Sequence, residues 1–354
     1  MRSTLRHLRI RIRVAVAALS VGLIVASTVG GSAVAFNAGP GGLPAGCTWT
    51  IHELPMPPGW IDGFARRGDG SSFVGYGTDP GGAVRSLLWR QGAVTELASP
   101  GGAEAEALDV NRRGAVLAFT HFQRPRPFVW INGRVVPLAV PAGATSTIGY
   151  AINDAGIIVG SAVVAGATHG IVWSLRSPQR YRDLGVADGS LDLNDLTETG
   201  VIVGSSQTSD PFTGPIRALR GTVAEGLSSL PGVDPAQDSH AARAAGRYVI
   251  GIGQVPGAAA DRSGVLWKGD VATALPPAMG ALAVNSKGLV AGYISDGRSR
   301  VTTWAAGTTW TLPDLSDFAP LGNSAANDVM EDGTVIGGST TADGRSVPVT
   351  WTCG

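Results

Sequence analysis

The chain has 354 residues with 27 basic and 27 acidic side chains, and charged residues make up 15% of it. Apolar residues reach 44%, which is too high for a disordered chain. A net charge of zero lacks the excess of Lys and Arg that a nucleic-acid-binding surface requires.

Residues 1–35 have the pattern of a secretory signal peptide. Five arginines stand within the first 13 positions, an apolar run covers 14–29, and Ala33, Val34 and Ala35 form a small-residue cleavage site. The alternative is an uncleaved anchor, because the apolar run approaches the length that spans a bilayer. We expect cleavage and an extracellular protein. The remaining chain has an excess of acidic side chains, so we expect no contact with an anionic membrane.

Residues 36–46 predict a flexible leader before a single domain at 47–354. The two cysteines of the chain, Cys47 and Cys353, stand at the two ends of that domain. In an exported protein a lone pair is most simply a disulfide. A reactive thiol or a metal ligand is the alternative.

A unit of about 44 residues recurs along the domain. In its third copy, turn residues separate four runs with strand-like spacing, at 149–153, 156–164, 170–174 and 181–186. Gly156 ends a tight turn and is expected at positive φ, and Gly160 indicates a bulge or a close backbone approach. The copies are anchored on the glycine before the second run: Gly70, Gly114, Gly156, Gly200, Gly288 and Gly333, with Arg247 in a degenerate fifth copy.

Seven four-stranded units of this size predict an all-β, seven-bladed β-propeller. The third run of six units ends in a tryptophan: Trp89, Trp130, Trp173, Trp267, Trp304 and Trp351. We expect these rings to pack between neighbouring blades, each with its indole N–H bound to one acceptor, rather than to stack on a ligand.

The last unit has no fourth strand of its own after Trp351. The segment WTIHELP at 49–55 has the pattern of the fourth strands at 93–100 and 310–315. We predict that this N-terminal strand pairs in the last blade, closes the propeller and brings Cys47 beside Cys353. Closure also removes the two sheet edges that an open array would expose.

The third unit resembles the HAF family of bacterial extracellular repeats, whose units contain IN-x-x-G-x-x-V-G, then HAF-x-W, then DLG. The matching positions are Ile152, Asn153, Gly156, Val159, Gly160, His169, Trp173, Asp183, Leu184 and Gly185. In the other units the match is reduced to the glycine, the apolar strand and the tryptophan. The resemblance implies a secreted, propeller-like array and no established activity.

No catalytic or metal-binding motif stands out in the sequence, so we predict no metal and no cofactor. The histidines after the signal, which have no metal-site spacing, are His52, His121, His169 and His240. The acidic segments 195–200 and 330–338 lack the alternating ligands of calcium loops and predict plain turns. Arg67, Gly68 and Asp69 spell an adhesion tripeptide, which we interpret as a coincidence.

Ligands of propellers usually bind where loops gather at one mouth of the central channel. We expect the loops between the fourth strand of one blade and the first strand of the next to form that mouth. They are acidic and polar, and a solvated set of loops is the alternative reading. The candidate ligand-binding residues are Asp62, Glu106, Asp192, His240 and Asn323.

The sequence therefore predicts a secreted, monomeric, non-enzymatic module that binds a carbohydrate or an extracellular protein at the channel mouth. The alternative is a glycoside hydrolase or polysaccharide lyase that uses Asp62, Glu106 and Asp192. A glycosidase needs two carboxyl groups about 5–9.5 Å apart, one of them with a raised pKa. A purely structural envelope protein is a third possibility.

Overall fold

The computed structural model describes residues 43, 47–121, 124–186, 189–208, 215–234, 237–255, 263–277, 279–295, 299–316 and 324–354. All of them belong to one unit of the chain, residues 32–354. The predicted signal peptide and most of the predicted leader lie outside these ranges. Within them, the helical structure is a single 3₁₀ turn, η1 (Pro100–Gly102), and no helix is long and apolar enough to cross a membrane.

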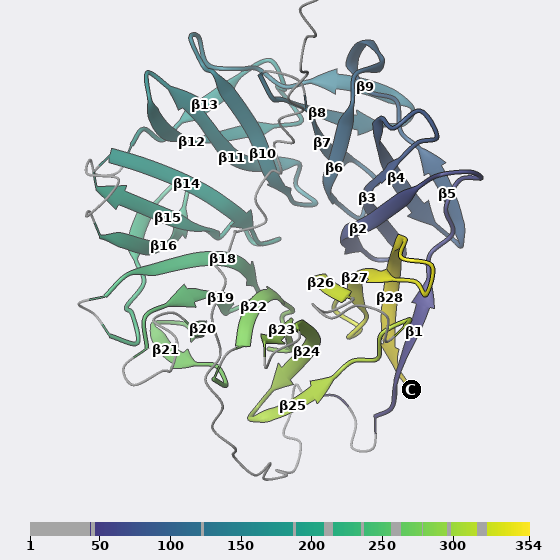
Figure 1. Ribbon diagram of the computed structural model, residues 1–354. Coiled ribbons are helices and arrows are strands. Elements are labelled where there is room, and N and C mark those ends of the chain that lie inside the picture. The colour runs from purple at the N-terminus through teal and green to yellow at the C-terminus, as the bar shows by residue number, and fades with distance from the viewer. Residues whose placement is uncertain are drawn as a thin grey trace, which may run out of the picture. The chain divides into compact units, whose positions relative to one another are not determined.

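The unit is a ring of seven antiparallel sheets of four strands each, as predicted (Figure 1). Blades 1 to 3 are formed by β2 (Asp62–Asp69), β3 (Ser72–Thr78), β4 (Val84–Arg90) and β5 (Ala93–Glu96); β6 (Ala105–Val110), β7 (Val116–Thr120), β8 (Arg126–Ile131) and β9 (Arg134–Pro137); and β10 (Ser146–Ile152), β11 (Ile157–Val164), β12 (Ala167–Ser174) and β13 (Tyr181–Asp183). In each of them the first strand lies nearest the centre of the ring.

The same order continues through the second half of the chain. Blades 4 to 6 are formed by β14 (Gly189–Leu196), β15 (Ile202–Thr208), β16 (Ile216–Thr222) and β17 (Gly226–Ser229); β18 (Ser239–Ala245), β19 (Tyr248–Gly253), β20 (Ser263–Lys268) and β21 (Val271–Ala274); and β22 (Met279–Val284), β23 (Val290–Ser295), β24 (Ser299–Ala305) and β25 (Thr308–Thr311).

Blade 7 is built from both ends of the domain. It contains β26 (Ser324–Val329), β27 (Val335–Thr340), β28 (Ser346–Cys353) and, as its outermost strand, β1 (Trp49–Glu53). Trp49 pairs with Cys353, and the ladder continues to Glu53. The predicted closure by the N-terminal strand is confirmed.

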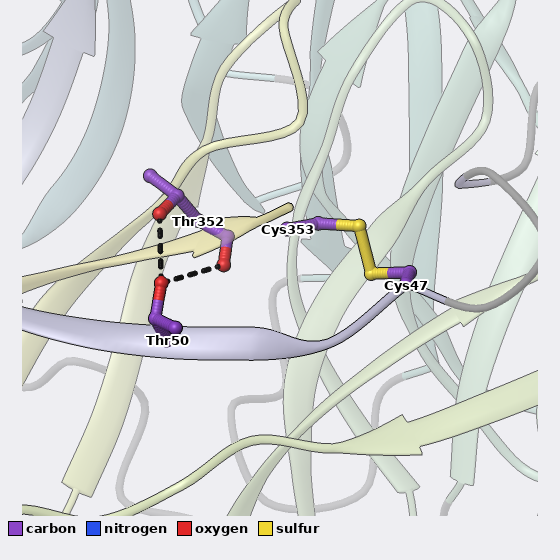
Figure 2. The surroundings of a disulfide bond; sticks show 4 residues. All are labelled: Cys47, Thr50, Thr352 and Cys353. Atoms are coloured by element: carbon purple, nitrogen blue, oxygen red, sulfur yellow. Dashed lines mark hydrogen bonds between the residues drawn. A yellow bond between two sulfur atoms is a disulfide. The ribbon is translucent and has the colours of Figure 1, made fainter.

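A disulfide joins Cys47 and Cys353 at the end of this ladder where Trp49 pairs with Cys353 (Figure 2). Their Cα atoms are 5.5 Å apart, and 306 positions of sequence separate them. Next to the bond, the Thr50 hydroxyl donates to the carbonyl oxygen of Thr352, at 3.3 Å. Leu43, the described residue of the segment 36–46 predicted as a leader, is 8% exposed and belongs to a core cluster with Trp49 and Leu289. Flexibility in the rest of that segment stays a prediction.

A close backbone approach explains the glycine in the second strand of most blades. A Cβ on Gly160 would lie 2.0 Å from the carbonyl oxygen of Ile148, and the β10–β11 register shifts between Gly149 and Ala151, opposite Gly160. The same shift recurs in all seven innermost strands. Glycine stands at the equivalent place in six blades: Gly75, Gly160, Gly204, Gly251, Gly292 and Gly337. The glycine thus makes room for a β-bulge in the innermost strand, which re-aims the side chains that follow.

The tight turn after each innermost strand contains a glycine at positive φ, as expected for Gly156, whose φ is 75°. In blade 5 the prediction on Arg247 was wrong by one residue. Gly246 occupies that turn with φ 55°. The misplacement arose because the turn of blade 5 has only two residues, Gly246 and Arg247, whereas the template from blade 3 assumed a longer one.

Four of the six tryptophans fulfil the predicted role between blades. The donors are Trp89, Trp173, Trp267 and Trp351, whose Nε1 atoms donate to the carbonyl oxygens of Pro55, Ala139, Pro231 and Pro313 at 2.6–2.8 Å. Each acceptor belongs to the preceding blade, and the four rings are at most 1% exposed. Trp130 and Trp304 are half-buried and pack beside other core clusters.

Replacing both cysteines by serine, Cys47→Ser with Cys353→Ser, should lower the free energy of unfolding by about 2–4 kcal/mol, because the unfolded chain regains the freedom that the long covalent loop removes. Denaturant unfolding of the double variant and of the oxidised wild type measures this. Equal stability would mean that the β1–β28 ladder closes the ring without the bond.

Gly160→Ala should lower the free energy of unfolding by about 2 kcal/mol, because the new Cβ would lie 2.0 Å from the carbonyl oxygen of Ile148 and the β10–β11 backbone would have to shift to admit it. The matched control is Gly166→Ala in the same blade. Gly166 has φ 87° and nothing within 4 Å of a Cβ, so only the strain of about 1 kcal/mol applies. A smaller loss for Gly160→Ala than for Gly166→Ala would contradict this explanation.

Candidate functional site: a polar cavity on the propeller axis

All seven blades line a cavity of about 730 Å³. Its walls are the last residues of the innermost strands and the turns that lead from them to the second strands. The cavity therefore lies at one end of the central channel. The loops from fourth to first strands, which we expected to form the ligand-binding mouth, belong to the opposite end.

Charged residues occupy the base of this cavity at one repeated position. The residue directly after the bulge in each blade defines what we call the central ring: Arg67, Asp109, Ala151, Asp195, Arg243, Ala283 and Asp328. The five charged members all line the cavity. A two-residue bulge at the same place in every blade thus gathers side chains that are far apart in sequence.

Arg67 is the hub of the ring. Its Nη1 atom donates to Asp195 Oδ1 at 2.8 Å and to Asp109 Oδ2 at 3.3 Å, and the residue is 9% exposed. Burial by itself would lower the pKa of Arg67, but the negative charges of Asp195 and Asp109 outweigh it, so this pKa is raised. The guanidinium stays charged.

The three aspartates of the ring also join neighbouring blades through backbone N–H groups. One oxygen of each carboxylate accepts a bond from the next blade, and the pairs are Asp109 with Ile152 N at 2.8 Å, Asp195 with Ala244 N at 2.8 Å, and Asp328 with Gly68 N at 3.1 Å. The other oxygen accepts from Val110 N, Arg67 Nη1 and Val329 N respectively. Every oxygen of these carboxylates therefore already has a protein donor.

Burial changes the pKa of several of these groups. It raises the pKa of Asp109 to about 7, against the opposing charge of Arg67, and it raises the pKa of Asp328. Burial and the neighbouring charge of Arg67 lower the pKa of Arg243 to about 10.

The two guanidinium groups still have donors without an acceptor. Arg67 Nη2 and Arg243 Nε are buried and have no hydrogen-bond partner in the described part of the chain. Arg243 Nη1 donates to the carbonyl oxygen of Ala242 at 3.1 Å. Among the described residues, Arg243 makes no ion pair of 4.0 Å or less with a carboxylate, in contrast to Arg67.

The rim of the cavity is formed by the turns after the innermost strands and is mostly acidic. Side chains there bind the backbone of the preceding blade: Asp154 Oδ1 accepts from Arg112 N at 2.8 Å, Glu198 Oε2 from Asp154 N at 2.9 Å, and Glu331 Oε1 from Ser286 N at 3.0 Å. These bonds fix the turns, while the side chains remain partly exposed.

Three rim carboxylates, of Asp69, Asp154 and Glu198, bring oxygen atoms within 4.8 Å of one another. Oxygen ligands of this kind suit Ca²⁺ or Mg²⁺. Arg112 already contributes a cation there, with its Nε 3.1 Å from Asp69 and 3.9 Å from Asp154. Burial raises the pKa of Asp69 and of Glu198.

The described residues that we expected at the ligand-binding mouth lie nearer than the central ring to the opposite end of the channel, the end formed by the loops from fourth to first strands. Glu106, Asp192 and His240 share one position on β6, β14 and β18, three residues before the central ring. Asp62 begins β2 and is half-buried, and Asn323 lies outside the described residues. None of the four described candidates lines the cavity.

Each member of that set has a local partner. Glu106 forms an ion pair with Arg66 at 2.5 Å and a hydrogen bond with His121 at 3.2 Å. Burial raises the pKa of Asp192, which also accepts a hydrogen bond from Ser161. Their role in ligand binding stays a prediction.

The central ring escaped the sequence analysis. Arg67 was taken as part of a coincidental tripeptide, and Asp195 as part of a plain acidic turn. A signal was present, since three blades share an aspartate and an apolar residue just before the turn: Asp109 with Val110, Asp195 with Leu196 and Asp328 with Val329. Nothing local marks Arg67 or Arg243 as their neighbours.

No protein-family model matches the chain, and no curated protein does. Solved structures are similar in fold. A puromycin-hydrolysing peptidase of Mycobacterium tuberculosis shares 14% identity at a TM-score of 0.57, over 84% of this chain and 53% of its own. This chain thus spans about half of that peptidase.

Two further structures are covered almost completely. The β-propeller domain of the Trilobed protease of Pyrococcus furiosus has 10% identity and a TM-score of 0.52, over 82% of this chain and 93% of its own. An oligogalacturonate lyase in complex with manganese has 12% identity and a TM-score of 0.56, over 88% and 94%. These likenesses show the fold alone.

The raised pKa of Asp109 predicts a pH dependence of stability. Between pH 4 and 7 the folded protein holds a proton that the unfolded chain has released, since the ordinary pKa of 3.8 becomes about 7. The free energy of unfolding should therefore fall as pH rises through this window, by on the order of 1 kcal/mol per pH unit.

Asp109→Asn should remove this contribution, so that wild type loses stability relative to the variant between pH 4 and 7. Denaturant unfolding at several pH values measures it. The control is Asp343→Asn, which changes an exposed carboxylate on a turn of blade 7. Parallel pH profiles of wild type and Asp109→Asn would contradict the assignment.

Proposed function

We propose that the protein is a secreted, non-enzymatic propeller that binds a small polar ligand, a carbohydrate. The ligand would bind in the cavity formed by the turns after the innermost strands. The supporting observation is the imbalance at the base of the cavity. The three aspartates have their oxygens occupied by protein donors, whereas the two arginines have buried donors to spare. A site with fixed carboxylates and free donors is suited to hydrogen-bond a ligand rather than to transfer protons.

The size and rim of the cavity agree with a ligand of this class. Its volume of about 730 Å³ lies within the range of small-molecule sites, about 300–1,000 Å³. Partly exposed carboxylates on the rim, such as those of Asp154 and Glu331, offer acceptors for hydroxyl groups. Export is supported by the signal-like sequence of residues 1–35 and by the disulfide, which belongs in an oxidising compartment.

We also propose that the blades are HAF-type repeats and that the protein is a monomer without nucleic-acid or membrane partners. Closure of the ring supports the monomer, because β28 pairs with β1 of the same chain and so needs no strand from a second copy. An extracellular protein bound at the rim is the other partner class that remains within this proposal.

A second candidate is a polysaccharide lyase or glycoside hydrolase. One observation favours it: Asp109, whose pKa burial raises to about 7, shares the donor Arg67 with Asp195, so two carboxyl groups lie close together. The likeness in fold to an oligogalacturonate lyase agrees with this candidate. Its residues would then be those of the central ring rather than Asp62, Glu106 and Asp192.

A glycan array probed with the purified mature protein tests the proposal. Thr199→Trp, which places a large ring on an exposed rim residue, should weaken binding at least tenfold. Thr309→Trp on the outer strand β25 is the matched control and should bind as wild type does.

Glycans that bind are then incubated with the protein and the products analysed by mass spectrometry. Intact glycans are expected. Cleaved products that Asp109→Asn no longer forms would replace the binding function by the enzymatic one. Equal binding by Thr199→Trp and wild type would place the ligand elsewhere on the propeller.

A further inference from the structure

We infer that the ligand of the cavity carries a single carboxylate, held by Arg67 and Arg243 at the base, with its hydroxyl groups directed toward the rim. This inference rests on the proposed function and specifies its ligand as an acidic sugar. It starts from the two guanidinium donors that lack acceptors.

Arg67 and Arg243 stand at the same position of blades 1 and 5, and both line the cavity. Removing a guanidinium N–H from water without giving it an acceptor costs free energy. Arg67 is 9% exposed and its Nη2 has no partner within the described residues; neither has the buried Nε of Arg243. An acceptor from outside the chain would satisfy both.

The aspartates of the ring act on Arg243 through their charges, but none forms an ion pair of 4.0 Å or less with it in the described chain. Two of them are bound to Arg67, and Asp328 accepts from the backbone of Gly68 and Val329. Arg243 is thus a half-buried cation with a buried Nε and without an ion pair of 4.0 Å or less in the described chain. A partly buried charge of this kind is stabilised when an anion comes into contact with it.

A carboxylate fits these donors. The guanidinium group presents its N–H donors in a planar fork that matches two carboxylate oxygens. Two arginines that line one cavity would hold one such group, as a charge-assisted contact that a neutral hydroxyl cannot equal.

The rim sets the opposite requirement and limits the negative charge of the ligand. Asp69, Glu198 and Glu331 line the entrance, and a polyanion would have to pass these carboxylates at a cost in repulsion. The same oxygens accept hydrogen bonds from neutral hydroxyl groups. A ligand with one acid group and several hydroxyls meets both ends of the cavity, whereas a sulfated polysaccharide does not.

The test is a set of glucuronic- and galacturonic-acid oligosaccharides, each printed beside its methyl ester, its neutral parent and a sulfated form. Wild type should bind the singly acidic members, and the methyl esters should bind at least tenfold more weakly, since esterification keeps the shape and removes the charge. Arg243→Gln should lose the preference for acid over ester.

Arg243→Gln is chosen because the residue makes no ion pair of 4.0 Å or less with the described chain, so its removal should leave the ligand-free protein folded, with a small change in Tm. Arg345→Gln is the matched control. Arg345 is an exposed arginine in the turn between β27 and β28, and it forms an ion pair with Asp343. This variant should bind every member as wild type does.

The outcomes separate this inference from the proposed function. Equal binding of acids, esters and neutral parents would leave carbohydrate binding in place and overturn the carboxylate, and so would a preference for the sulfated forms. If no glycan binds, carbohydrate binding fails, and glucuronate against glucose in thermal unfolding decides the inference. A rise in Tm with glucuronate alone, in wild type but not in Arg243→Gln, would support it, and no rise would overturn it.

Discussion

Backbone pairing between β1 and β28 is the interaction on which the rest of the structure depends. It places the first strand of the domain in the last blade, so that every blade has a neighbour on both sides. Without it the contacts between blades 7 and 1, such as the bond from Gly68 N to Asp328, would have no fixed geometry. The Pyrococcus furiosus domain of similar fold is described as having an open Velcro topology, whereas this chain closes by a strand and a disulfide.

Closure and close packing of the backbone together create the cavity. In six blades a glycine such as Gly160 makes room for the bulge in the innermost strand, and in every blade the residue after the bulge belongs to the central ring. Because all seven blades repeat this geometry, the identity of one residue per blade decides the chemistry at the base. The chain has arginine or aspartate at five of these positions and alanine at two.

Local features were predictable from the sequence, and the site was not. The turn at Gly156, the close backbone approach at Gly160 and the packing of tryptophan between blades could each be predicted from one repeat unit and its neighbours. The contact of Arg67 with Asp195 joins residues 128 positions apart. It exists because the innermost strands of blades 1 and 4 lie at the same axis, although two blades of sequence separate them. The bulge shifts the register by one residue, so a simple alternation of inward and outward side chains misplaces the charges.

The tryptophan bonds between blades follow an alternating pattern. All four donors stand in odd-numbered blades, 1, 3, 5 and 7. Within the described residues the bonds thus hold the blades together in pairs. Seven is an odd number, so pairs cannot tile the ring. The mismatch is located at blade 7, which accepts a donor from Trp89 of blade 1 and donates to blade 6 through Trp351. The blade assembled from both chain ends is therefore the one held by indole bonds on both sides.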